Sequence, residues 1–213
     1  AEVEQEKEEG CCGVSEPLPI LLDYVASHSH AIFTRGELNL NIIGLRSSNP
    51  RAGKFDDRIC VVYKDKNGWI SRCWKATCDP GVYFLKHPMR VEGCAVLAPG
   101  QYRGAYRIGT HRNYTSLVQT GGPVRLFRDR NFDEIVDQEA RTLTDPVYAG
   151  INIHRASPRK DGKSGGGSTE VQKWSAGCQV LADADDHAEL MGLAQASSAR
   201  YGNSFTYTLL PAP

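Results

Sequence analysis

Two short stretches of the chain carry side chains that can do nucleophilic chemistry. Cys178 lies beside Gly177 and close to Ser175, and His154 ends the alternating apolar and polar run 151–154. A thiol becomes an effective nucleophile when its surroundings lower its pKa or when a neutral imidazole accepts its proton. An adjacent glycine lets the backbone approach a substrate closely and offer N–H groups to an oxyanion. This combination predicts a cysteine acyl-transfer site, with Cys178 as the nucleophile and His154 as the base.

Both residues also have a structural interpretation. A cysteine in an apolar segment is most often a small buried hydrophobic side chain, and a single histidine that ends a strand is most often structural. The segment between the two motifs, 157–173, is rich in Gly, Ser, Lys and Pro, which predicts a mobile loop arching over a cleft. Residue types alone therefore leave both interpretations open.

The two motifs together resemble the catalytic domain of the L,D-transpeptidase family. In that family a histidine is followed, after a loop, by Ser/Thr-His-Gly-Cys, and His154 and the segment 175–178 stand in this order here. The segments 97–102 and 106–109 are similar to the Thr-Pro-x-Gly-x-Phe/Tyr region that precedes the catalytic half of the family. The resemblance spans residues 95–182.

Three positions depart from the family pattern. Ala176 stands where the family has a second histidine, and Gln179-Val180 replace an aliphatic residue followed by Arg or Asn. Arg155-Ala156 replace the small pair that commonly follows the histidine. The chain is therefore similar to a divergent member of the family, with a substrate that differs in detail.

The resemblance implies a mainly β domain, a β-sandwich or barrel-like structure of the L,D-transpeptidase type with one or two short helices. It also implies a reaction in which the thiolate attacks a peptidoglycan stem peptide, forms a thioester and releases D-alanine. Water as the acceptor makes the protein an L,D-carboxypeptidase, and an amine of another stem makes it a transpeptidase. No cofactor or metal is implied, and the site of action is the cell envelope, the periplasm or the exterior.

The expected catalytic residues are Cys178, His154, Ser175 and Gly177. The residues expected to contact the substrate are Arg155, Trp174, Ala176, Gln179 and Tyr102.

A non-enzymatic alternative stays open, in which the chain is a cell-envelope or phage-derived binding or structural module with a degenerate site. The three departures support it. The enzyme requires His154 and Cys178 within hydrogen-bond reach, whereas the module predicts ordinary thiol reactivity. A papain-like protease is disfavoured because its cysteine precedes its histidine.

Length and composition indicate one β-rich domain. The chain has 213 residues, of which 1–17 form an acidic tail and 18–213 form the expected domain. Acidic and basic residues balance at 25 each, so no net charge attracts nucleic acid. No apolar run approaches the roughly 18 residues of a membrane span, and no signal peptide is visible.

Several elements can be placed from periodicity and turn signals. Asn67-Gly68 lies between apolar runs and predicts a hairpin of strands 59–63 and 69–76. A helix is expected within 19–30, and a second over 186–201, capped by Asp183 or Asp185 and stopped by Gly202. Further short strands are expected at 37–43, 82–85, 102–108, 117–119, 124–128 and 204–209.

The seven cysteines are an odd number. If Cys178 is the nucleophile, the other six allow up to three disulfides in an oxidising compartment. Cys60 lies in an apolar strand pattern and is expected to be buried and free, whereas the pairing of Cys11, Cys12, Cys73, Cys78 and Cys94 stays open. The spacing of Cys73 and Cys78 does not fit a zinc knuckle, and the sequence has no matching second pair.

Overall fold

A computed structural model describes residues 17–156 and 167–213 of the chain. The predicted acidic tail thus lies almost entirely outside the described residues, as do Cys11, Cys12 and most of the predicted loop 157–173. The helices in the described part are α1 (Ile20–Ser27), α2 (Val82–Lys86) and α3 (Ala184–Tyr201), with a 3₁₀ turn η1 (Ala140–Thr142). The strands are β1 (Asn41–Arg46), β2 (Asp57–Asp65), β3 (Gly68–Thr77), β4 (Cys94–Leu97), β5 (Gly100–His111), β6 (Tyr114–Val118), β7 (Leu126–Asp129), β8 (Ile153–Arg155), β9 (Gln179–Leu181) and β10 (Phe205–Pro211).

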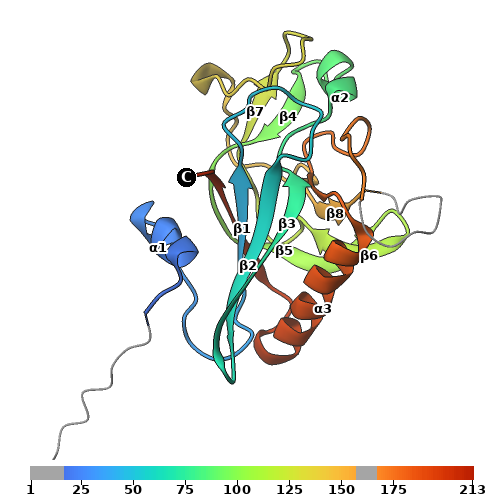
Figure 1. The fold of residues 1–213 in the computed structure, drawn as a ribbon. Coiled ribbons are helices and arrows are strands. Elements are labelled where there is room, and N and C mark those ends of the chain that lie inside the picture. The colour runs from blue at the N-terminus through green and yellow to red at the C-terminus, as the bar shows by residue number, and fades with distance from the viewer. Residues whose placement is uncertain (1–16, 157–166) are drawn as a thin grey trace, which may run out of the picture.

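Eight of these strands close into a barrel, which confirms the mainly β class. Their order around the barrel is β1-β10-β5-β6-β8-β9-β3-β2, and β4 and β7 form a separate two-stranded sheet at one end (Figure 1). Most neighbours are antiparallel, but β1 pairs with β10 and β8 pairs with β9 in parallel. Parallel neighbours require a crossover connection, so each of these pairs joins segments that are distant in sequence.

The β2–β3 hairpin has the predicted position and turn. Asp65 pairs with Gly68, whose φ of 117° is readily adopted by glycine. The same register places Cys60 directly opposite Cys73, with 4.1 Å between their Cα atoms, and the two form a disulfide. The expectation that Cys60 is free was therefore wrong, because the hairpin register brings a second cysteine to its side.

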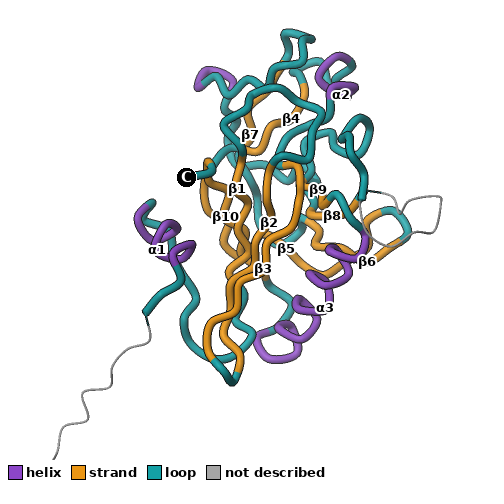
Figure 2. Tube along the Cα trace, viewed as in Figure 1, coloured by secondary structure: helices purple, strands orange, loops and turns teal. Residues whose placement is uncertain are grey.

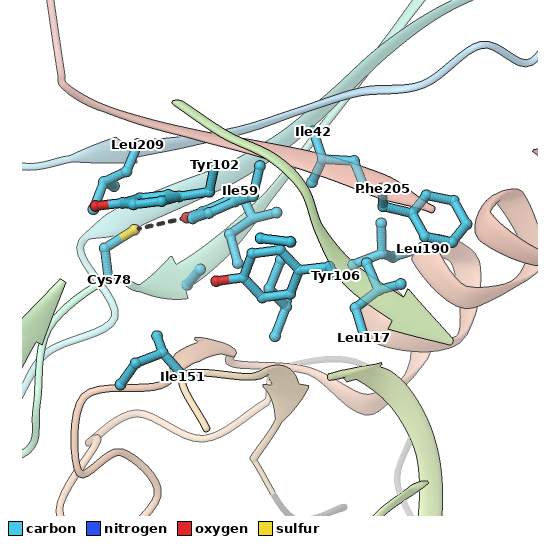
Figure 3. Close-up of a cluster of buried hydrophobic side chains, with 14 of the residues drawn as sticks. Ile42, Ile59, Cys78, Tyr102, Tyr106, Leu117, Ile151, Leu190, Phe205 and Leu209 are labelled. Atoms are coloured by element: carbon cyan, nitrogen blue, oxygen red, sulfur yellow. Dashed lines mark hydrogen bonds between the residues drawn. The ribbon is translucent and has the colours of Figure 1, made fainter. Parts of the chain in front are cut away.

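The barrel interior is filled by aliphatic and aromatic side chains. Tyr106 and Tyr207 are fully buried and meet edge to face, with ring centroids 5.7 Å apart. The Tyr207 hydroxyl donates to Gln179 Oε1 at 2.9 Å and lies 3.7 Å from the Cys78 sulfur. Figure 3 shows the contact of the Cys78 sulfur with a hydroxyl oxygen inside an otherwise apolar cluster. A buried tyrosine hydroxyl needs such a partner, so the position of Tyr207 and that of Gln179 are coupled.

The helices lie on the outside of the sheet (Figure 2). Leu22 and Val25 of α1 pack on Ile43, Val62 and Leu210 of the barrel wall. Their spacing of three residues places them on one face of the helix, as the sequence predicted.

The helix α3 ends at the predicted residue and begins two residues before the predicted range 186–201. Asp183 caps it, accepting a hydrogen bond from Asp185 N at 2.8 Å, and Gly202 ends it with a φ of 83°. Its apolar face, which includes Leu190 and Ala194, joins the main core cluster.

Two expectations about helices were wrong. The segment 82–85 was predicted as a strand but lies in the helix α2, in which only Leu85 is buried. The described residues also contain three α-helices, one of them 18 residues long, instead of one or two short ones. A five-residue helix is too short for a 3.6-residue period to show in the sequence, which explains the first error. None of the described helices has the length and apolarity needed to cross a membrane.

Tyr207→Phe is expected to lower the free energy of unfolding by about 1–3 kcal/mol, because it leaves the buried acceptor Gln179 Oε1 without its donor. Urea unfolding followed by circular dichroism measures this change. Tyr148→Phe is the matched control, since Tyr148 is 62% exposed, and should leave stability unchanged. Equal stabilities of the two variants would contradict the proposed role of the buried hydroxyl.

Candidate active site

The parallel pairing of β8 and β9 brings the two sequence motifs together. In the register, Ile153 stands opposite Gln179 and His154 opposite Val180, and Gln179 N donates to Asn152 O at 2.9 Å. Side chains alternate along a strand, so Cys178 lies on the same face as Val180, two residues later. Because Val180 stands opposite His154, Cys178 and His154 lie on the same face of the two strands. Cys178 and His154 accordingly line one pocket.

The backbone turn before Cys178 is held by Ser175 and shaped by Gly177. The Ser175 hydroxyl donates to Cys178 O at 2.7 Å and accepts from Gly177 N at 3.1 Å, and the Ser175 side chain is fully buried. Gly177 has a φ of 122°, and a Cβ atom there would lie 2.6 Å from the carbonyl oxygen of Ala95. Only glycine fits this turn. Ser175 is buried and stabilises the turn through its two hydrogen bonds, so its hydroxyl does not face a ligand.

The hydrogen bonds of His154 fix its tautomer. Its Nδ1 lies 3.0 Å from Arg155 O, a carbonyl that can only accept, so Nδ1 carries the hydrogen. Tyr114 donates its hydroxyl hydrogen to the same carbonyl, and its oxygen lies 3.3 Å from Nδ1. The other nitrogen, Nε2, is then unprotonated and is the basic atom of the ring. A backbone carbonyl therefore holds the tautomer of His154.

Both members of the pair are neutral near pH 7. The pKa of His154 is lowered to about 3, mainly by burial and to a smaller degree by the neighbouring His111, His187 and Arg112, against the opposing effect of the hydrogen bond to Arg155 O. Burial also raises the pKa of the Cys178 thiol to about 11. Among the described residues no hydrogen bond joins the thiol to His154, and Cys178 Sγ donates to Gly150 O at 3.5 Å. The site thus holds a thiol and a neutral base, not a thiolate–imidazolium pair.

The pocket around Cys178 has a volume of about 470 Å³ and a strongly basic lining. Four of its lining side chains are cationic, and none of the described lining residues is acidic. The cationic residues are Arg90, Arg112, Arg128 and Lys173. Because the whole chain has no net charge, this local excess favours an anionic ligand.

Two of the five predicted substrate contacts, Trp174 and Ala176, line the pocket with Cys178. Arg155 does not line it, because its guanidinium lies 4.3 Å from the centre of the Tyr114 ring and donates to Ala156 O. Its direct contact with a ligand in this pocket is therefore not supported.

The structure places Gln179 and Tyr102, which were expected to contact the substrate, in the barrel interior and not in the lining of the Cys178 pocket. Gln179 follows the nucleophile by one residue and so points to the opposite face of the strand, into the barrel, where it is fully buried. Tyr102 is 8% exposed and donates its hydroxyl to Ala98 O inside the core. Both residues are parts of the scaffold.

An aromatic cluster surrounds His154 and was not expected from the sequence. The ring of His111, from the end of β5, stacks on His154 with centroids 4.1 Å apart and planes inclined by 13°. His187 of α3 is buried, meets Ser116 Oγ at 3.1 Å and has its pKa lowered by burial to about 4. His111 lies far from both motifs in sequence, so no local spacing could have linked it to the site. His187 follows Cys178 closely in sequence, but only the packing of α3 brings it near His154.

Within the described residues no group of three or more His, Cys, Asp or Glu side chains is arranged to hold a metal ion. Comparisons with protein-family models, with curated proteins and with solved structures gave no match to this chain.

Alkylation of Cys178 by iodoacetamide should accelerate steadily from about pH 7 to about pH 9, because a thiol with a raised pKa keeps gaining thiolate over this range. Peptide mass spectrometry of the alkylated residue gives the rate. A rate that levels off below neutrality would indicate a thiolate–imidazolium pair and contradict the neutral state.

His154→Ala should slow the reaction at neutral pH, whereas His28→Ala, at an exposed histidine outside the pocket, should not.

Proposed function

We propose that the protein transfers acyl groups of peptidoglycan stem peptides through a Cys178 thioester, as an L,D-transpeptidase or L,D-carboxypeptidase with a divergent fold of that type. The observation that carries the proposal is the shared pocket, which is lined both by a partly exposed thiol and by a histidine whose Nε2 is basic. The motif resemblance supports the substrate class.

The chemistry follows from the protonation states. His154 Nε2 accepts the thiol proton as Cys178 Sγ attacks the carbonyl carbon. Gly177 N and Gln179 N are already bonded to Ser175 and Asn152, so the backbone N–H of Cys178 is the donor of this turn proposed for the oxyanion. The tetrahedral intermediate collapses, the C–N bond breaks, and His154 returns the proton to the leaving amine. Water or an acceptor amine then attacks the thioester and regenerates the thiol. Catalytic hydrogen bonds are often long before substrate binds, so the thiol must leave Gly150 O to reach the imidazole.

The charge of the pocket supports a peptide stem as the ligand. A stem tetrapeptide ends in a free carboxylate, and four cationic side chains border the pocket without an acidic one among the described lining residues. Arginine binds carboxylates in a two-pronged geometry, which also orients the scissile bond.

A second candidate is the non-catalytic binding module, and one observation favours it. The Cys178 thiol is hydrogen-bonded to Gly150 O, and its pKa is raised to about 11 by burial. A module of this kind would use the basic pocket to hold the stem without cleaving it.

Incubation with disaccharide tetrapeptides, followed by mass spectrometry, separates the two candidates. The enzyme removes or exchanges the terminal D-alanine, and Cys178→Ala abolishes this while preserving the fold. Loss without replacement indicates hydrolysis, and cross-linked products indicate transpeptidation. If the wild type leaves the substrate unchanged yet binds it as tightly as Cys178→Ala does, the acyl-transfer proposal is wrong and the module is favoured.

Arg112→Gln is expected to raise KM for the tetrapeptide, with kcat affected less, because Arg112 is an exposed cation on the rim of the pocket. The loss should shrink as salt is added, since salt screens exposed charges. Arg103→Gln is the matched control, an exposed arginine on β5 that does not line the pocket. Equal KM values for both variants would exclude Arg112 from substrate binding.

A further inference from the structure

His111 is a second imidazole in the pocket of Cys178. It lies at the end of β5, lines the same cavity as Cys178 and His154, and stacks almost parallel on the His154 ring. Position 176, next to the nucleophile turn, carries alanine. The only imidazoles among the described residues of the pocket lining are therefore His111 and His154.

Asn152 fixes the tautomer of His111. The Asn152 Oδ1 atom accepts from Gln119 N at 2.9 Å, and a backbone N–H can only donate, so the orientation of the amide is determined. Its Nδ2 group therefore donates to His111 Nδ1, which lies 3.0 Å away. A neutral imidazole that accepts at Nδ1 carries its hydrogen on Nε2.

The two stacked rings are thus complementary. His154 is protonated on Nδ1 and presents a basic Nε2, whereas His111 is protonated on Nε2 and presents a donor. Among the described residues no hydrogen bond to Nε2 of His111 is found, so this donor is available to a ligand. Burial and Arg112 lower the pKa of His111, which keeps the ring neutral near pH 7.

We propose that His111 donates its Nε2 hydrogen to the carbonyl oxygen of the acyl substrate and so stabilises the oxyanion that forms when Cys178 attacks. This inference rests on the proposed function, since it assigns an additional catalytic residue to the same reaction. A neutral donor that is already positioned where negative charge develops can stabilise the transition state strongly, because no reorganisation is needed during the reaction.

The decisive comparison is between His111→Gln and His111→Phe. Glutamine places an amide N–H close to the position of Nε2, whereas phenylalanine keeps a ring to stack on His154 but has no donor. Loss of an oxyanion donor typically lowers kcat about 10²–10³-fold, so we expect such a loss for His111→Phe and substantial activity for His111→Gln. The reverse order would overturn the proposal and assign His111 a stacking role. Thermal unfolding of both variants verifies that they are folded.

Thiol alkylation separates a donor role from an effect through His154. Reaction of Cys178 with iodoacetamide forms no oxyanion, so His111→Phe should alkylate at the wild-type rate while it loses turnover. A parallel loss of alkylation would show that His111 acts on the thiol–imidazole pair, which contradicts the proposal.

The tautomer can be tested without any substrate. Long-range ¹H–¹⁵N spectra of the free protein should show His111 protonated on Nε2 and His154 protonated on Nδ1. In Asn152→Asp the new carboxylate oxygen can only accept from His111, so Nδ1 of His111 should become protonated. A wild-type His111 protonated on Nδ1 would overturn the inference even if acyl transfer is confirmed. If His111 has the expected tautomer but the protein does not turn over the tetrapeptide, the proposed acyl-transfer function is wrong, and the assignment of the His111 tautomer still holds.

Discussion

The parallel pairing of β8 and β9 is the constraint on which the site depends. These strands have only three residues each, and their register alone sets Asn152 and His154 beside Cys178. Inward-facing Ile153 and Leu181 are fully buried and anchor the pair in the barrel core. Burial of these apolar side chains therefore fixes the positions of Cys178 and His154, although the thiol and the imidazole make no hydrogen bond with each other.

Gln179 extends this anchoring to the nucleophile turn. Its side-chain amide donates to Gly177 O and Cys78 O, while Tyr207 donates to its carbonyl. A buried amide with its partners satisfied is rigid, because breaking any of these bonds leaves a desolvated polar group. The turn that carries Cys178 is consequently stabilised by hydrogen bonds from the barrel interior, and its outer face lines the pocket in which a ligand can bind.

The electrostatics of the pocket have two separate layers. The inner layer of Cys178, His154 and His111 is neutral, because burial disfavours the charged form of each group, the thiolate of Cys178 and the imidazolium of the two histidines. The outer rim is cationic, with Arg112 exposed. Such an arrangement attracts an anionic ligand from a distance while it leaves an uncharged base for proton transfer.

Local signals in the sequence determined the β2–β3 hairpin, the capped helix α3 and the glycine before Cys178, since each depends on backbone preferences of a few adjacent residues. The same logic could have paired Cys60 with Cys73 and turned Gln179 inward, because hairpin register and strand alternation are local rules. Only the tertiary structure decided the neighbours of His154. His111 and His187 reach it from β5 and α3, and the physical reason is that strand pairing and core packing, not sequence spacing, decide which distant side chains meet.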